Sequence, residues 1–366
     1  MATRGEDMKE VYQPGNARRG RGVGRPMRST PVIAFGVLSL FLLACEGEAA
    51  QAVEGITSPT PAAEANKPAT EAAPAPDWQA LAGKALTEAG EPGTVIVMDA
   101  KEGKVLGLAE KGGQVEHPAT AARHPASSIK PIVAVAAIAE GKLSPKDEVS
   151  CAGPREIDGQ TYTCFHDHGA VTLDRAMRTS CNHFAYEVAT RLSLEEINKH
   201  LGIFGYGRST GLAPDGVPEA EGKLLSGGKI EGAIGHGELL ATPLQIAKAY
   251  TALATGRIPA RVEAPLPYRE DQLERVRKGL LGTVQHEEGS GHDARIDGLA
   301  IAGKTGTAEL EPKETDEAKY LSYFASWAPA DDPQIVVVVQ LESKSAAPDS
   351  AVPAVRPIYE ALKGSR

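Results

Sequence analysis

The sequence predicts an α+β sandwich, in which an antiparallel sheet is formed from both ends of one domain and a helical lobe is inserted between its strands. Three observations indicate this arrangement. Apolar, β-branched segments lie near residues 94–108 and again within 298–341, helical patterns fill the middle of the chain, and a closing helix is predicted at 352–362. Catalytic groups would then lie in the cleft between the sheet and the lobe.

Residues 1–45 have the pattern of an export signal. Arginines are frequent before residue 29, and an uncharged apolar run then extends from Pro31 to Ala44. This run is shorter than the roughly 20 residues of a spanning helix and is typical of a signal sequence. It ends in Leu-Leu-Ala-Cys at residues 42–45, which resembles a bacterial lipobox. We expect Cys45 to be acylated and to hold the chain at a membrane, facing the periplasm or the cell exterior; an uncleaved short anchor is the alternative.

Residues 46–77 are rich in Ala, Glu, Pro and Thr. Such a segment cannot bury enough apolar surface to offset the entropy of ordering it. We expect a disordered tether there and one domain over 78–366, with no further domain upstream. The formal net charge is -9, which argues against nucleic acid as a partner because phosphate contacts require basic side chains.

The domain is predicted to open with a hairpin and to continue with helices. Residues 94–98 and 104–108 are apolar on either side of a turn that contains glycine. Residues 128–139 are apolar on every face, which predicts a helix buried all round. Two further helices are predicted at 172–178 and 184–192.

Two capping boxes mark the next helices. Ser193 with Glu196 begins a helix that closes near Gly205, and Thr242 with Gln245 begins another that extends to Gly256. Strands are then predicted at 298–304, 320–327 and 334–341, followed by the closing helix.

Three short motifs could carry chemistry. S-x-x-K occupies residues 127–130, S-x-N residues 180–182 and K-T-G residues 304–306. A second S-x-x-K, at 226–229, contains two glycines that do not favour a helix and follows S-x-N, so we discard it.

The spacing of the first motif suits an activated serine. Residues three apart on a helix share one face, so the amine of Lys130 can accept the proton of the Ser127 hydroxyl. A lysine is a base near neutral pH only if its pKa is lowered, and a buried helix together with a second cation, Lys304, would lower it.

The other two motifs suit substrate binding and proton transfer. Ser180 can relay a proton to a leaving amine, and Asn182 can orient Lys130. Lys304 and Thr305 can hold a carboxylate, whereas Gly306 lets a substrate backbone approach a strand closely. The N–H of Thr307, with that of Ser127, could form an oxyanion hole.

The flanks of these motifs resemble one known family. Residues 125–132, 180–184, 235–245 and 302–308 are similar to the conserved blocks of penicillin-binding-protein transpeptidases, with His236 where that family usually has glutamine. The resemblance covers roughly residues 90–365. It implies a DD-peptidase/β-lactamase-like fold with Ser127 as nucleophile, peptidoglycan stem peptides as substrate and β-lactams as covalent inhibitors. A glycosyltransferase is an expected partner.

The reaction implied is attack of Ser127 on the penultimate D-Ala carbonyl, with transfer of the acyl group to an amine or to water. Two alternatives stay open. One is a serine β-lactamase, although no counterpart of the class A glutamate loop is found. The other is a sensor or scaffold that binds β-lactams or peptidoglycan without catalysis.

No cofactor and no metal are expected. Cys151, Cys164 and Cys181 remain if Cys45 is lipidated, and Cys151–Cys164 is the favoured disulfide, with three reduced thiols as the alternative. His166 and His168 flank Asp167, but spacing supplies no third metal ligand.

Overall fold

A computed structural model describes residues 75–144, 146–258, 264–310, 319–346 and 350–366. The predicted leader and most of the predicted tether therefore lie outside the described residues. Among the helices that are described, none combines the length and the apolar character needed to cross a bilayer.

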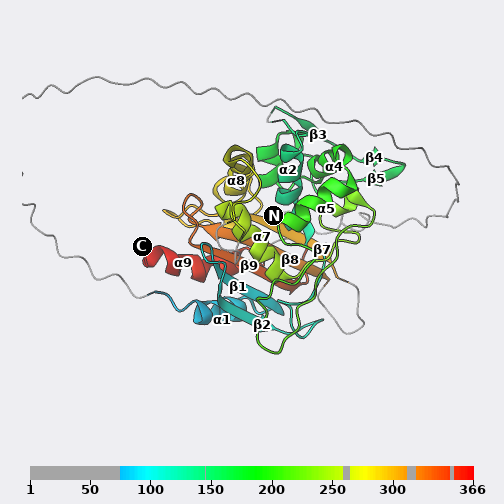
Figure 1. Ribbon diagram of the computed structural model, residues 1–366. Coiled ribbons are helices and arrows are strands. Elements are labelled where there is room, and N and C mark those ends of the chain that lie inside the picture. The colour runs from blue at the N-terminus through cyan, green and yellow to red at the C-terminus, as the bar shows by residue number, and fades with distance from the viewer. Residues whose placement is uncertain (1–74, 145, 259–263, 311–318, 347–349) are drawn as a thin grey trace, which may run out of the picture. The chain divides into compact units, whose positions relative to one another are not determined.

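The described residues form a five-stranded antiparallel sheet in the order β2-β1-β9-β8-β7 (Figure 1). Its strands come from the two ends of the described chain, as predicted. Their bounds are β1 Gly93–Asp99, β2 Val105–Lys111, β7 Ala302–Glu309, β8 Tyr320–Ala328 and β9 Ile335–Ser343.

Alternation along the strands divides the core between the two faces of the sheet. On β1, Val95 and Val97 pack with α1 (Trp78–Ala89) and α9 (Arg356–Gly364), whereas Ile96 and Met98 point to the other face. Successive side chains of a strand point to opposite faces, so a strand that is apolar at every position has a helix layer on both sides. Figure 1 shows α1 and α9 on one side of the sheet and α7 and α8 on the other.

The helical lobe is inserted between β2 and β7. Its helices are α2 Lys130–Ala139, α3 Leu173–Arg178, α4 Asn182–Arg191, α5 Leu194–Ile203, α6 Lys229–Gly232, α7 Pro243–Thr255 and α8 Glu270–Gln285. Every residue of α2 except Ala139 is buried, as its apolar pattern predicts. Both predicted capping boxes are present, at the starts of α5 and α7.

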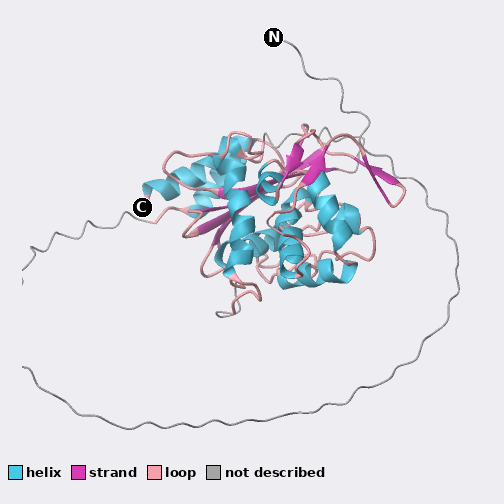
Figure 2. Ribbon diagram, turned by 90° about the horizontal axis from the view of Figure 1, so that it is seen from above, coloured by secondary structure: helices cyan, strands magenta, loops and turns pink. Residues whose placement is uncertain are grey.

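Short strands occupy one edge of the lobe. β3 (Val149–Cys151) pairs with β6 (Gly169–Val171), and β4 (Arg155–Ile157) pairs with β5 (Gln160–Tyr162). The β4–β5 hairpin projects beyond the helices in both views (Figure 2). These pairings bring the segment around Cys164 back to the start of α4.

Several elements differ from the sequence prediction. Helices α1, α6 and α8 and the short strands β3 to β6 were not predicted. The strand expected at 298–304 begins instead at Ala302 and continues to Glu309, because Gly298, at φ 76°, forms a turn closed by the bridge between Ile296 and Leu299. The whole K-T-G motif therefore lies on a strand at the edge of the described sheet.

Candidate active site

The nucleophile candidate, Ser127, lies in a 3₁₀ turn, Ala126–Ile129, that leads directly into α2. Ala126 adopts a positive φ of 51°, and its N–H donates to the carbonyl of Gly235 at 3.1 Å. The carbonyl of Ser128 accepts from the hydroxyl of Tyr250 at 2.8 Å. Hydrogen bonds from two other segments therefore fix the backbone on both sides of Ser127, which is 7% exposed.

The amine of Lys130 joins the first motif to the second. Its Nζ donates to the carbonyl of Ser180 at 2.6 Å and to Oδ1 of Asn182 at 2.6 Å, and Ser180 Oγ lies 3.3 Å away. Burial lowers the pKa of Lys130 to about 8, against the pull of three nearby cysteines. The amine is therefore oriented by its neighbours and can lose a proton close to neutral pH.

The S-x-N residues lie in the turn between α3 and α4. Ser180 has a φ of 57°, which is uncommon for a residue other than glycine. Cys181 is the N-cap of α4 and is buried, as expected from its position between Ser180 and Asn182. The strained turn presents a hydroxyl and a carbonyl to the same amine.

The K-T-G strand lies against the turn that carries Ser127. A Cβ atom built on Gly306 would lie 3.2 Å from the Cβ of Ala126 and 3.3 Å from the backbone nitrogen of Ser127. These separations are tighter than ordinary van der Waals contact, so a side chain at residue 306 would require its neighbours to move by a few tenths of an ångström. Ser127 and the third motif are therefore neighbours in space.

The two lysines of the site influence each other. Lys304 is fully buried, and its Nζ donates to the carbonyl of Thr305 at 3.1 Å. Burial, and then the positive charge of Lys130, holds the pKa of Lys304 well below the usual value of a lysine. The sequence predicted two causes for a lowered pKa of Lys130, namely burial and the charge of Lys304. Burial is the largest cause, whereas the electrostatic effect between the two lysines lowers the pKa of Lys304.

Thr305 and Thr307 lie on alternate positions of the same strand. Thr305 is buried, and its Oγ1 forms a 2.7 Å hydrogen bond with Oγ of Ser290. Ser290 follows α8 and belongs to no motif, so no sequence pattern pointed to it. Thr307 is partly exposed.

The second S-x-x-K sequence lies apart from this chemistry. Ser226 of the second S-x-x-K is hydrogen-bonded to Glu238, and Lys229 donates to the carbonyl of Leu192 at 2.6 Å.

His236 lies beside the site, because it follows Gly235, whose carbonyl accepts from the N–H of Ala126, and it stacks on His124. Burial, and then the charges of His124 and Lys130, lower the pKa of His236 to about 4.

For the cysteines, the favoured disulfide prediction was wrong and the alternative of three reduced thiols holds. Cys151, Cys164 and Cys181 are free thiols, so the favoured Cys151–Cys164 disulfide is not formed. Together with His168 they form a cluster whose sulfur and nitrogen atoms all lie within 4.8 Å of one another, so these four residues could hold a metal. The hydrogen bond from Cys181 is the main cause that lowers the pKa of Cys164, helped by His168 and by the N–H of Asn182.

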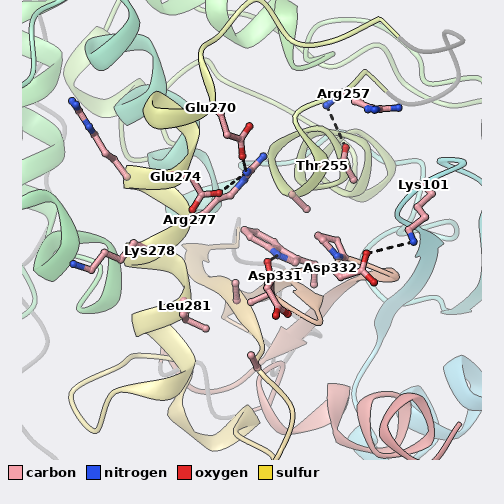
Figure 3. A pocket seen from close by; sticks show the side chains of 17 residues that line it. Lys101, Thr255, Arg257, Glu270, Glu274, Arg277, Lys278, Leu281, Asp331 and Asp332 are labelled. Carbon is pink, nitrogen blue, oxygen red and sulfur yellow. Dashed lines mark hydrogen bonds and ion pairs between the residues drawn. The ribbon is translucent and has the colours of Figure 1, made fainter. Parts of the chain in front are cut away.

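A separate cavity of about 1110 Å³ lies between α7, α8 and the turn after β8. Figure 3 shows its charged side chains, among which Arg277 pairs with Glu270 and Glu274, and Lys101 with Asp332. None of the motif residues lines it. The residues that converge around Ser127 are therefore the better candidate for catalysis.

Comparison with known proteins identifies the family of the chain. The family model described as "Penicillin binding protein transpeptidase domain" matches residues 93–360. Peptidoglycan D,D-transpeptidase MrdA of Haemophilus influenzae is 28% identical over 285 residues, which are 64% of this chain and 44% of that protein. Stage V sporulation protein D of Bacillus subtilis is 28% identical over 293 residues, 68% of this chain and 45% of that protein. The chain thus spans less than half the length of these relatives.

Solved structures show the same fold. PBP2 of Pseudomonas aeruginosa, in complex with WCK 5153, has a TM-score of 0.68 at 22% identity, covering 77% of this chain and 76% of that one. The transpeptidase domain of penicillin-binding protein 3 from Burkholderia pseudomallei has a TM-score of 0.67 at 23% identity, covering 78% and 92%. The mixed α+β architecture predicted from the sequence is therefore confirmed.

Proposed function

This chain belongs to the penicillin-binding-protein transpeptidase family, and from that premise we propose that it is a serine acyl-transferase acting on peptidoglycan stem peptides. The observation that carries the proposal is the hydrogen-bonding of the Lys130 amine. Lys130 lies three residues after Ser127 on a buried helix, and its amine is held by Ser180 and Asn182.

The first step is attack of Ser127 Oγ on the carbonyl of the penultimate D-Ala. The hydroxyl proton passes to the neutral amine of Lys130, whose lowered pKa suits a general base. Negative charge that develops on the carbonyl oxygen is stabilised by the N–H groups of Ser127 and Thr307. The close approach of Gly306 to the Ser127 backbone supports this pairing of donors.

Collapse of the tetrahedral intermediate releases the terminal D-Ala. Its amine takes a proton through the hydroxyl of Ser180, which is within 3.3 Å of Lys130. An acyl-enzyme on Ser127 remains. An amine from a neighbouring stem then forms the new peptide bond, or water hydrolyses the ester. Lys130 accepts the proton of the attacking group and returns it to Ser127 Oγ as the ester bond breaks.

The substrate is held against the edge of the sheet. The outer edge of β7 has backbone groups that an extended stem peptide can pair with. The terminal carboxylate binds Lys304 and Thr305. Its negative charge favours the protonated form of Lys304, which burial alone disfavours.

Mass spectrometry of the full chain after incubation with penicillin tests the nucleophile. We expect a stable adduct on Ser127 and none in Ser127→Ala. Ser226→Ala, which alters the serine of the other S-x-x-K sequence, is the matched control and should be acylated like the wild type. Labelling that persists in Ser127→Ala would refute the assignment.

Turnover assays then separate the possible acceptors. Release of D-Ala from a D-Ala–D-Ala peptide should be measured with and without an added amine, which distinguishes transpeptidation from carboxypeptidation. Many turnovers per second on a chromogenic cephalosporin would favour a β-lactamase instead. Penicillin labelling without D-Ala release would favour a sensor or scaffold.

Export and anchoring are part of the same proposal. The basic leader, the apolar run and the sequence Leu-Leu-Ala-Cys support a lipid on Cys45, outside the described residues. Incorporation of labelled palmitate by the wild type, and its loss in Cys45→Ala, would support lipidation over an uncleaved anchor. A glycosyltransferase partner would supply the glycan strands that bear the stems.

A further inference from the structure

The four residues of the thiol cluster come from three separate segments of the chain. Cys151 ends β3, Cys164 and His168 lie in the connection between β5 and β6, and Cys181 caps α4. Cys151 and Cys181 are buried, and the other two are partly buried. Such convergence of sulfur and imidazole is not a consequence of local sequence.

Distances in the cluster fit a tetrahedral metal. Nδ1 of His168 lies 3.3 Å from Sγ of Cys151 and 3.6 Å from Sγ of Cys164. Bonds of about 2.3 Å to sulfur and about 2.0–2.1 Å to nitrogen place the ligands of a tetrahedral zinc ion about 3.5–3.8 Å apart. A disulfide would join only two sulfurs and leave the third thiol and the imidazole without a common partner.

We propose that Cys151, Cys164, His168 and Cys181 bind a zinc ion as a closed, four-coordinate structural site. Three thiolates with one imidazole are soft donors, which suit zinc better than magnesium or calcium. The thiols release their protons to solvent as the metal binds. The chain supplies all four ligands.

Hydrogen bonds around the cluster support it as a metal site. The N–H of Asn182 donates to Sγ of Cys164 at 3.2 Å, as expected for a thiolate ligand. Nη1 of Arg175 donates to the carbonyl of His168 at 2.8 Å and orients the segment that carries the imidazole.

The role of the metal follows from the position of Cys181. This ligand lies between Ser180 and Asn182, the two residues that hold the Lys130 amine. Zinc would tie their strained turn to β3 and to the connection before β6. This role rests on the proposed function, whereas metal binding itself does not.

Metal analysis of the full chain, purified without chelator, tests the site directly. We expect one zinc per molecule in the wild type, and loss of the zinc in Cys164→Ser and His168→Ala. His166→Ala, which removes the neighbouring exposed imidazole, is the matched control and should keep the zinc. Cobalt substitution should give the near-ultraviolet charge-transfer band of cobalt–thiolate bonds.

Reversible metal removal tests the positioning role without a variant that could misfold. Metal-depleted wild type should be acylated by fluorescent penicillin at least roughly tenfold more slowly, with recovery when zinc is restored. Ser127→Ala should bind zinc normally but remain unlabelled. If wild-type protein binds zinc but is never acylated, the proposed function fails and the metal site stands.

Four results would overturn the metal site or its positioning role. Zinc-free wild-type protein that also gives no cobalt spectrum would refute the metal site, as would iron in place of zinc. A mass two hydrogens below that of the reduced chain, with two thiols no longer titratable, would show a disulfide instead. Unchanged acylation after complete metal loss would refute the positioning role.

Discussion

Lys130 is held by three contacts that come from one turn of the chain. Its amine meets the carbonyl and hydroxyl of Ser180 and the amide of Asn182, and burial lowers its pKa to about 8. These contacts therefore orient the amine, and the burial of the site favours its neutral form.

Acylation by penicillin should rise with pH and level off above about 8, because only the neutral amine can accept the serine proton. Below that pKa the amine is protonated and the base is lost. Lys130→Arg should lower the acylation rate by roughly 10²–10⁴-fold, since a guanidinium stays charged. Stopped-flow acylation across the neutral and mildly alkaline range measures both effects. A flat pH profile in the wild type would contradict Lys130 as the base.

Single residues were predictable where a motif named them. The sequence brought Ser127, Lys130, Ser180 and Lys304 into one hypothesis, and the structure places them together. Ser290 and the cysteine cluster could not be predicted, because their partners come from segments that only the tertiary fold brings close.

At the scale of elements, capping chemistry predicted helix starts better than strand ends. The boxes at Ser193 and Thr242 are both formed, since their hydrogen bonds involve residues three apart. Strand β7 is defined by its ladder to β8, so local sequence misplaced its start. Helix α8 was missed even though Leu273, Val276, Leu280 and Val284 recur at helical spacing.

The loop that contains Gly235 connects the lobe to the nucleophile turn. Gly235 has a φ of 79°, and a Cβ atom there would lie 2.1 Å from the carbonyl oxygen of Ala126. Its own carbonyl accepts the N–H of Ala126. The absence of a side chain therefore keeps two loops in register at the residue before Ser127.

Gly235→Ala should lose more unfolding free energy than the roughly 1–3 kcal/mol of backbone strain alone, because the added Cβ also clashes with the backbone of Ala126. The variant should also be acylated more slowly. Gly237→Ala is the matched control. Gly237 also has a positive φ, of 68°, but its nearest contact would be 3.4 Å away. That variant should lose only about 1–2 kcal/mol and keep the acylation rate of the folded protein. Chemical denaturation and penicillin labelling compare the two, and equal effects would refute the clash.

At the scale of the whole described domain, the two faces of the sheet have different roles. Ala126 and Ile129, beside the nucleophile, pack in the core under the lobe, whereas Ile358 and Tyr359 of α9 pack on the opposite face. The antiparallel pairing of β1 with β9 closes the domain by joining its first strand to its last. This arrangement was predictable, because apolar strand patterns lie at both ends of the domain and helical patterns lie between them.

Stability and chemistry should therefore separate across the sheet. Ile358 is fully buried, so Ile358→Ala should lose about 2–5 kcal/mol of unfolding free energy. Acylation per folded molecule should stay at the wild-type rate, because Ile358 packs in the core on the face of the sheet opposite the lobe. Glu360→Ala, on the same helix, is the control and should change stability by less than about 0.5 kcal/mol, since its ion pair with Arg356 is exposed. Denaturant melts give the first quantity, and labelling well below the midpoint gives the second. Slower acylation by folded Ile358→Ala would show instead that the sheet transmits packing changes from α9 to the K-T-G strand.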